Sequence, residues 1–188
     1  MEKTFDRTQR RQLLALARSV IDEQVRHGRP QPPACPDPAL AVPRGCFVTI
    51  KQHGQLRGCI GTFQAERPLW QNVAQMAAAA ATGDPRFYPM QAADLADFAL
   101  EISVLTPMRA IAAVAEIEVG RHGLYLELGS YRGVLLPQVA SEYGWDRDTF
   151  LRQTCHKAGL PANAWQSEKC RIYTFSAEVF GEHPETPC

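Results

Sequence analysis

The sequence has no excess charge of either sign and no long apolar run. Its 20 Lys and Arg residues balance 20 Asp and Glu residues, so the formal net charge at pH 7 is zero. A chain without a basic excess lacks long-range attraction for nucleic acid or an anionic membrane. The N-terminus is charged, unlike a secretory signal, and no stretch has the length of a membrane span. We therefore expect a cytoplasmic protein that binds neither nucleic acid nor membrane.

Signature motifs of several enzyme classes are also missing. The sequence contains no GxGxxG, P-loop, HExxH, GxSxG or EF-hand pattern, which removes the usual support for nucleotide, zinc-protease, hydrolase and calcium sites. Its six cysteines are scattered, without a CxxC pair or zinc-ribbon spacing. In a reducing compartment we expect free thiols. The sequence therefore predicts no metal site and identifies no cofactor.

Helical and strand patterns alternate irregularly along the chain. With 45% hydrophobic residues, its 188 residues can bury a sizeable core. Hairpins lie between helices and no repeated βαβ rhythm is present, which predicts an α+β fold with antiparallel sheets and flanking helices. The expected helices are 6–27, 68–82 and 147–158, and the expected strands outside the hairpins are 98–105 and 170–180.

The segment from Leu56 to Gly61, LRGCIG, is the return strand of a predicted hairpin. If His53 and Gly54 form the turn, Lys51 pairs with Leu56 and the later residues follow in register. The more hydrophobic face is expected to meet the core. That face would hold Phe47, Leu56 and Ile60, while the site face would hold Val48, Ile50, Arg57 and Cys59, with Val48 opposite Cys59.

Cys59 is the candidate nucleophile of this strand. A nearby cation favours the reactive thiolate form of cysteine, and Arg57 is two residues away on the same expected face. Gly58 and Gly61 remove side chains beside the sulfur, so a ligand or another backbone can approach closely. The alternative interpretation is a small buried hydrophobe between glycines that mark a bulge or tight packing.

Three further segments contribute candidate site residues. Asp84 and Arg86, in the loop DPRF, either reach Cys59 as hydrogen-bond acceptor and anion binder or form an Asp-Pro turn with a salt-bridged arginine. Glu101 points away from the core on its strand, where it either assists proton transfer or is merely solvated. His122, between two glycines, is the first choice for a general base, although a lone loop histidine is more often a surface residue.

A second hairpin is expected over Gly123–Leu136, and it weakly repeats the first. Each hairpin has Arg followed by Gly, a short apolar strand and a helix opened by Pro. Val134 occupies the position equivalent to Cys59. An aliphatic residue can therefore fill that position, and the cysteine is informative only if it is accessible.

Six separate motifs follow one another along the chain: LRGCIG, DPRF, EISVL (101–105), HGL (122–124), LLPQVA (135–140) and FLRQTCHKAGL (150–160). Together and in this order they resemble the AMMECR domain family, whose bacterial and archaeal members are called AmmeMemoRadiSam system protein A. The resemblance covers about 5–182. It implies a single α+β domain with two lobes and a cleft near LRGCIG, and partnership with a Memo-like protein and a radical SAM protein. We expect a larger lobe of about 5–118 with a returning strand at 168–182, and a smaller lobe of about 119–165.

Two hypotheses for function remain open, because the family resemblance implies no reaction. In the first, the protein is a cysteine-dependent group-transfer enzyme for a small anionic or acyl substrate. Cys59 is the nucleophile, Arg57 and Arg86 hold the substrate, and His122 or Glu101 moves protons. In the second, it is a non-catalytic binding or adaptor module that presents a ligand or peptide to its partners. The sequence specifies neither the substrate nor the oligomeric state.

Overall fold

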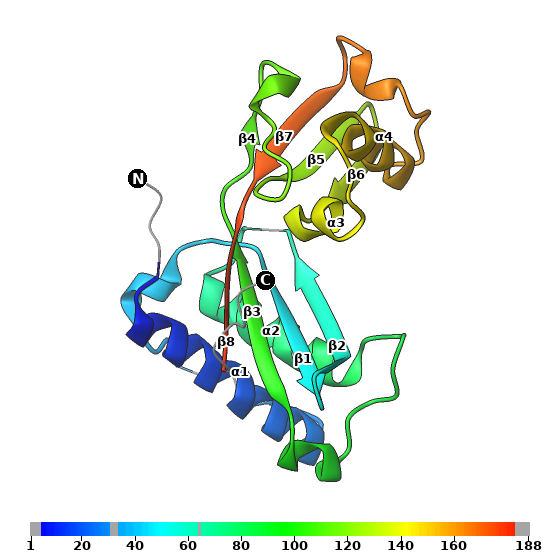
Figure 1. Ribbon diagram of the computed structural model, residues 1–188. Coiled ribbons are helices and arrows are strands. Elements are labelled where there is room, and N and C mark those ends of the chain that lie inside the picture. Colours follow the sequence, from blue (N-terminus) through cyan, green and yellow to red (C-terminus); the bar gives the residue numbers. More distant parts are fainter. Residues whose placement is uncertain (1–4, 31–33, 64, 183–188) are drawn as a thin grey trace. The chain divides into compact units, whose positions relative to one another are not determined.

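The structure is a computed structural model that describes residues 5–30, 34–63 and 65–182 (Figure 1). The chain divides into two compact units. The first comprises Met1–Leu105 with Glu178–Cys188, and the second comprises Thr106–Ala177. Cys188 lies outside the described residues. No helix in the described ranges is long and apolar enough to cross a membrane.

The first unit contains two long helices whose ends follow local sequence signals. Helix α1 (Arg7–His27) begins at a capping box in which Asp6 and Gln9 satisfy each other's backbone N–H, and it ends at Gly28 with a φ of 71°. Helix α2 (Leu69–Thr82) follows Pro68 and ends at Gly83. Both helices were expected at these positions, and both are confirmed. Two short 3-10 helices, Pro38–Ala41 and Ala92–Ala96, also belong to this unit.

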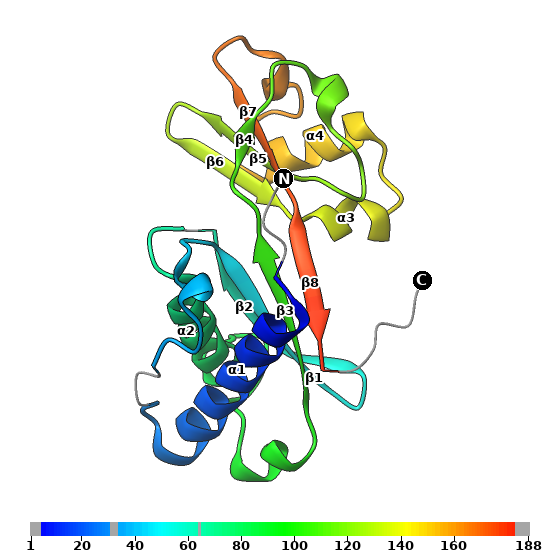
Figure 2. The same ribbon diagram turned by 90° about the vertical axis from the view of Figure 1, so that its left-hand side faces the viewer.

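The sheet of the first unit has the strand order β2-β1-β3-β8. Its strands are β1 (Cys46–Gln52), β2 (Gln55–Thr62), β3 (Ala99–Leu105) and β8 (Ala177–Gly181). Helices α1 and α2 lie together against one face of this sheet (Figure 2). The core between sheet and helices is aliphatic, and its fully buried side chains include Leu13, Ile21, Val48, Ile50, Leu69 and Ile102.

The first hairpin has the expected turn but a different register. Lys51 pairs with Leu56 as expected, and a bulge then makes Arg57 an extra residue, so Ile50 pairs with Gly58. Cys59 consequently pairs with Thr49, not with Val48. The expected assignment of faces on β1 was therefore wrong, because one added residue changes which side chains share a face.

The buried face of β1 carries Val48 and Ile50, which were expected on the site face. Phe47, expected in the core, lies on the opposite face, where its ring packs edge-on against Phe63 at 5.2 Å. Leu56 is 43% exposed, so it does not belong to the core either. Cys59 and Ile60 lie on opposite faces of β2, as the alternation of a strand requires.

Gly58 explains how α2 approaches the sheet. A methyl group at Gly58 would collide with the backbone carbonyl oxygen of Ala80. The run of alanines near the end of α2 has little side-chain bulk, which lets the helix backbone lie directly on β2. This close packing was expected from the alanines, and the contact between Gly58 and Ala80 is its physical basis.

The second unit has a separate antiparallel sheet with the order β4-β7-β5-β6. Its core contains Phe150, Leu151, Leu124, Leu126 and Ile117. Its elements are β4 (Arg109–Ala110), β5 (Gly123–Leu128), β6 (Tyr131–Leu135), α3 (Pro137–Glu142), α4 (Arg147–Lys157), β7 (Arg171–Phe175) and two short 3-10 helices, Val114–Glu116 and Ala164–Gln166. The expected hairpin and the helix capped by Asp146 are both present. Two antiparallel sheets with helices confirm the α+β class.

The final segment forms two strands where one was expected over Cys170–Phe180. Strand β7 pairs with β5 in the second sheet, and β8 belongs to the first sheet. Ser176 separates them, because its N–H and carbonyl groups bond to Thr106 at 2.8 and 2.9 Å. Only Ala177–Gly181 returns to the first sheet. The larger lobe was expected to comprise about 5–118 and a returning strand at 168–182. The first unit instead ends at Leu105 and resumes at Glu178.

Candidate functional site

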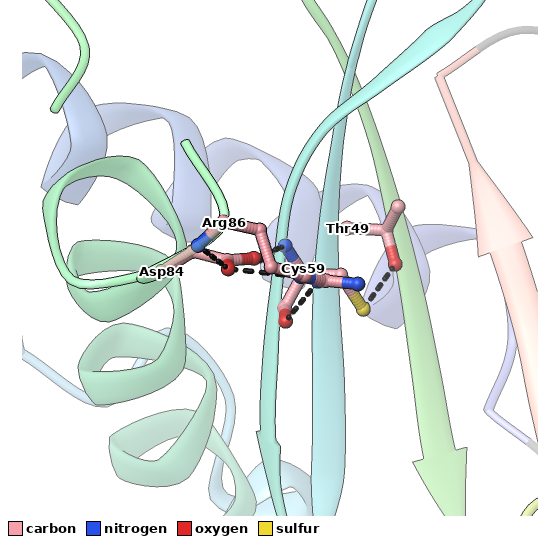
Figure 3. A network of polar contacts seen from close by, with 4 residues as sticks. All are labelled: Thr49, Cys59, Asp84 and Arg86. Carbon is pink, nitrogen blue, oxygen red and sulfur yellow. Dashed lines mark hydrogen bonds and ion pairs between the residues drawn. The ribbon is translucent and has the colours of Figure 1, made fainter. Parts of the chain in front are cut away.

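The Cys59 side chain lies on the sheet face opposite α1 and α2, directly across from Thr49. The Thr49 hydroxyl donates a hydrogen bond to the Cys59 Sγ at 3.2 Å (Figure 3). Thr49 and Cys59 form a non-hydrogen-bonded pair of the antiparallel ladder, because the N–H and carbonyl of Cys59 bond to other partners. Side chains approach most closely in such pairs, which explains the short distance from oxygen to sulfur.

Asp84 and Arg86 supply those other partners. Strand β2 is at the edge of its sheet, so the outward backbone groups of Cys59 have no neighbouring strand. The Asp84 Oδ2 accepts the Cys59 N–H at 2.9 Å, and the Arg86 Nη2 donates to the Cys59 carbonyl at 3.2 Å (Figure 3). One carboxylate and one guanidinium thus replace a missing strand at this residue.

The two charged side chains are also bonded to each other. The Arg86 Nε and Nη2 donate to the two oxygens of Asp84 at 3.0 and 2.7 Å, a bidentate pair. The Asp84 side chain is 2% exposed and the Arg86 side chain 55%. The bonds from Arg86 hold the pKa of Asp84 well below its ordinary value, with a smaller contribution from the Cys59 N–H, even though burial acts in the opposite direction. Asp84 is therefore a fixed, ionised acceptor.

The loop after α2 brings this pair to β2. Asp84 follows Gly83, and its Oδ1 accepts the N–H of Arg86 at 3.1 Å, as in an Asx turn. The Asp84 carbonyl accepts a hydrogen bond from the N–H of Phe87 at 3.1 Å, and the N–H of Met90 donates to the carbonyl of Ala81 at 2.9 Å. Both interpretations of DPRF therefore describe part of the geometry, since the turn is structural and its carboxylate and guanidinium reach Cys59.

The Arg86 guanidinium is bonded on only part of its edge. The pKa of Arg86 is raised first by its hydrogen bond to Asp84 and also by the charge of Asp84. Its Nη1 has no hydrogen-bond partner among the described residues. Two N–H groups of a half-exposed guanidinium thus remain for an anion next to β2.

Arg57, expected as the cation beside the sulfur, lies elsewhere. As the extra residue of the bulge it contacts Asp94 in the 3-10 helix Ala92–Ala96, with an Nη2 to Oδ2 distance of 3.3 Å. The pKa of Asp94 is lowered mainly by the N–H of Gln91, with further contributions from Gln52 and Arg57. No polar contact between Arg57 and Cys59 is found in the described residues. The structure brings Arg86, not Arg57, to the cysteine.

Glu101 shares the face of Cys59. Thr49 pairs with Cys59 on β2 and with Glu101 on β3, so the three side chains form a row across three strands. The Glu101 Oε2 binds the Lys51 Nζ at 2.9 Å, and both side chains are partly exposed. Thr49 and Lys51 were missed in the sequence, because only the true register of the hairpin places them beside Cys59 and Glu101.

Neighbouring atoms fill the space beside both glycines of the motif. Gly58 faces the Ala80 backbone on the core side, and a methyl group at Gly61 would collide with the ring of Phe47. The close approach that these glycines permit is thus made by the protein itself. The structure places neither glycine beside an open space for a ligand.

His122 belongs to the second unit, in the turn before β5. Its Nδ1 accepts the N–H of Glu118 at 3.1 Å, and Glu118 also pairs with Arg121 at 2.9 Å. This bond leaves the Nε2 for other partners. Within the ranges that the structure describes, no group of three His, Cys, Asp or Glu side chains is arranged to hold a metal ion.

Comparison with known proteins gives one consistent family. The AMMECR1 family model matches residues 14–180. A protein of Thermococcus onnurineus is 44% identical over 93% of this chain and 91% of its own length, and one of Pyrococcus furiosus is 43% identical over 93% and 89%. The crystal structure of an uncharacterized protein from Pyrococcus horikoshii is similar with a TM-score of 0.80 and 40% identity, covering 93% of this chain and 92% of that one.

Proposed function

The chain belongs to the AMMECR1 family. From the contacts of Cys59 we propose that it is a cysteine-dependent group-transfer enzyme with Cys59 as its nucleophile. The observation that carries the proposal is the hydrogen bond from the Thr49 hydroxyl to the Cys59 Sγ at 3.2 Å. A donor aimed at sulfur stabilises negative charge there, and the thiolate is the reactive form of cysteine.

The substrate is a small acyl compound or a related anion. The Cys59 sulfur attacks the acyl carbon and forms a C–S bond, and the bond to the leaving group breaks as that group departs with its electron pair and takes up a proton. A second nucleophile then attacks the thioester, gives up its proton and releases the sulfur. The two remaining N–H groups of Arg86 bind the anionic part of the substrate. Glu101, on the same sheet face as Cys59, exchanges the protons.

The partners in this proposal are a Memo-like protein and a radical SAM protein, as the family resemblance implies. A covalent thioester holds an acyl group without releasing it to solvent, which suits transfer between proteins that act in sequence. Because the net charge of the chain is zero, we expect local contacts and not long-range attraction to select these partners.

One observation favours the second candidate, a non-catalytic adaptor. Asp84 and three N–H groups of Arg86 bond to each other and to the main chain of Cys59, which is a structural use of both side chains. The same loop carries Tyr88, which is 91% exposed. Exposed aromatic residues beside an arginine are common anchors of protein interfaces. In this reading the segment 84–89 is a docking loop.

Alkylation kinetics test the enzyme proposal. The rate of reaction with iodoacetamide is measured against pH for individual peptides, with the exposed Cys35 as internal reference. We expect Cys59 to react faster than Cys35 near neutral pH, and we expect Thr49→Val to lower the Cys59 rate several-fold without changing the Cys35 rate. A Cys59 that reacts no faster than Cys35 in the native protein contradicts the thiolate mechanism.

Cys59→Ser separates the two candidates. The substitution is small and should leave the fold intact, whereas a hydroxyl lacks the reactivity of a thiolate. We expect the variant to bind the Memo-like partner in a pull-down but to fail to complement a strain that lacks the gene. Full complementation would rule out the enzyme. Lost pull-down with a folded variant would instead make the LRGCIG strand an interaction surface.

A further inference from the structure

A groove of about 740 Å³ lies within the first unit, between α1 and β8. Figure 2 shows β8 beside the N-terminal part of α1. The groove shares no residue with the Cys59 site. It is lined by four arginines and by apolar side chains, among them Arg7, Arg10, Arg11, Arg18, Leu14 and Phe180. Its volume is within the range of pockets that hold small molecules.

Two of the four arginines are held by the protein. The Arg10 Nε binds Glu178 at 2.9 Å. Arg18 binds both oxygens of Glu182 and the carbonyl of Phe98, and its guanidinium lies 4.0 Å from the centre of the Phe98 ring. The bond to Glu182 is the main cause of the raised pKa of Arg18. Arg10 and Arg18, each held by a glutamate, therefore form fixed walls of the groove.

The other two arginines, Arg7 and Arg11, are exposed and have no ion pair or hydrogen bond from their side chains among the described residues. They are four residues apart on α1, so they lie one turn apart on the same side of the helix, about 6 Å from each other at Cβ. The four arginines and the two glutamates together leave a net charge of +2. Exposed arginines on a helix are often only solvated, but these two border a cavity.

The remainder of the groove is apolar. Leu14 is 8% exposed and Phe180 is 6% exposed, and both contribute to the lining. Gly181 lies beside them without a side chain. A ligand for this groove would combine a doubly charged group near Arg7 and Arg11 with an apolar body against Leu14 and Phe180.

We propose that the groove between α1 and β8 binds a phosphate monoester with an apolar body. A phosphoryl group carries a charge of about −1.5 to −2 at neutral pH, which matches the excess charge of the groove. Its oxygens accept the paired N–H groups of arginine in a bidentate manner. The phosphate can belong to a small molecule or to a phosphorylated side chain of a peptide, and the two sources share this chemistry.

Calorimetric titration of the full chain with phenyl phosphate tests the proposal. We expect saturable binding that weakens about tenfold, or about 1.4 kcal/mol, in Arg7→Gln and in Arg11→Gln, since each variant loses a charge-assisted hydrogen bond to the phosphate. Arg29→Gln removes the same charge from an exposed arginine outside the groove lining and should bind like the native protein. Inorganic phosphate should bind more weakly than phenyl phosphate, because it cannot use the apolar wall.

Each other outcome contradicts a part of the proposal. The absence of saturable binding overturns it, and so does an equal loss of affinity in all three variants, which indicates non-specific attraction to positive charge. Equal affinity for inorganic phosphate and phenyl phosphate removes the apolar subsite. A tyrosine-phosphorylated peptide, with a matched unphosphorylated control, then distinguishes the two sources of the phosphate group. A peptide that binds more tightly than phenyl phosphate supports a protein ligand, and a peptide that does not bind supports a small molecule.

Discussion

Replacing Asp84 with Asn tests whether a buried carboxylate holds the Cys59 segment in place. The carboxylate accepts four hydrogen bonds, one from the Cys59 N–H at 2.9 Å and three from Arg86 at 2.7 to 3.1 Å. An amide keeps one oxygen and turns an NH2 group toward donors. Because Arg86 is half exposed and can regain water, we expect a loss of about 2–3 kcal/mol in the free energy of unfolding, less than for a fully buried pair.

The pH dependence of this loss has a defined sign. The pKa of Asp84 is lower in the folded protein than its ordinary value of about 3.9, so its stabilising contribution is complete above that value. It is lost as the pH falls below about 4 toward the folded pKa. Urea unfolding should therefore show the full difference between native protein and Asp84→Asn at pH 7, and a shrinking difference below pH 4.

Hydrogen exchange gives a local reading of the same substitution. The Cys59 amide should exchange faster in Asp84→Asn than in the native protein, because its acceptor is weakened. Asp22→Asn is the matched control, since Asp22 forms an exposed pair with Arg26 at 2.9 Å and its loss should cost about 0.5 kcal/mol or less. An unchanged Cys59 amide together with a loss no larger than that of the control would refute the role assigned to Asp84.

Three further substitutions probe the packing of the two units. Gly58→Ala should lower the free energy of unfolding by about 1–3 kcal/mol, because the new methyl group meets the helix backbone. Gly61→Ala should lower it less, because its methyl group meets a side chain that can rotate. Equal effects of the two variants in urea unfolding would contradict this difference. Glu127→Gln should destabilise the second unit by about 1–3 kcal/mol, since Glu127 pairs with Arg171 at 2.7 Å and accepts a hydrogen bond from the Tyr173 hydroxyl at 3.2 Å. A melting curve, followed by tryptophan fluorescence, that does not change in the variant would contradict this prediction.

The elements that could be predicted from the sequence are those set by neighbouring residues. The capping box of Asp6 and Gln9, the glycine after α1, and the alanine run before Gly83 fixed both long helices of the first unit. The turn at His53 and Gly54 was also correct, because positive φ values of 50° and 75° suit these residues. Such signals act within a few residues and need no knowledge of the rest of the fold.

The register of β2 could not be predicted in the same way. The bulge at Arg57 depends on Asp94, 37 residues later, and on the Ala80 backbone that lies against Gly58. A one-residue change reverses the faces of a strand pair, so Thr49 and Lys51 were missed. The DPRF loop was a candidate because its motif is local, whereas the hydrogen bond that the Cys59 N–H donates to Asp84 depends on the fold.

The repeated Arg-Gly step of the two hairpins has a common physical cause. Gly58 faces the Ala80 backbone of α2, and a methyl group at Gly133 would lie 2.5 Å from the Thr154 carbonyl of α4. In each unit a helix backbone lies directly on the second strand of a hairpin, which only glycine allows. The repeat therefore reflects how a sheet meets a helix and carries no information about chemistry.

The next residue differs between the two hairpins. Val134 pairs with Tyr125 in the second hairpin as Cys59 pairs with Thr49 in the first, each on the face away from the helix. The second hairpin thus has an aliphatic residue at the step where the first has a thiol. The two positions differ in their cross-strand neighbours, since a hydroxyl is aimed at the Cys59 sulfur and a tyrosine lies opposite Val134. The two hairpins therefore share the glycine that meets a helix and differ in the cross-strand contact of the residue that follows it.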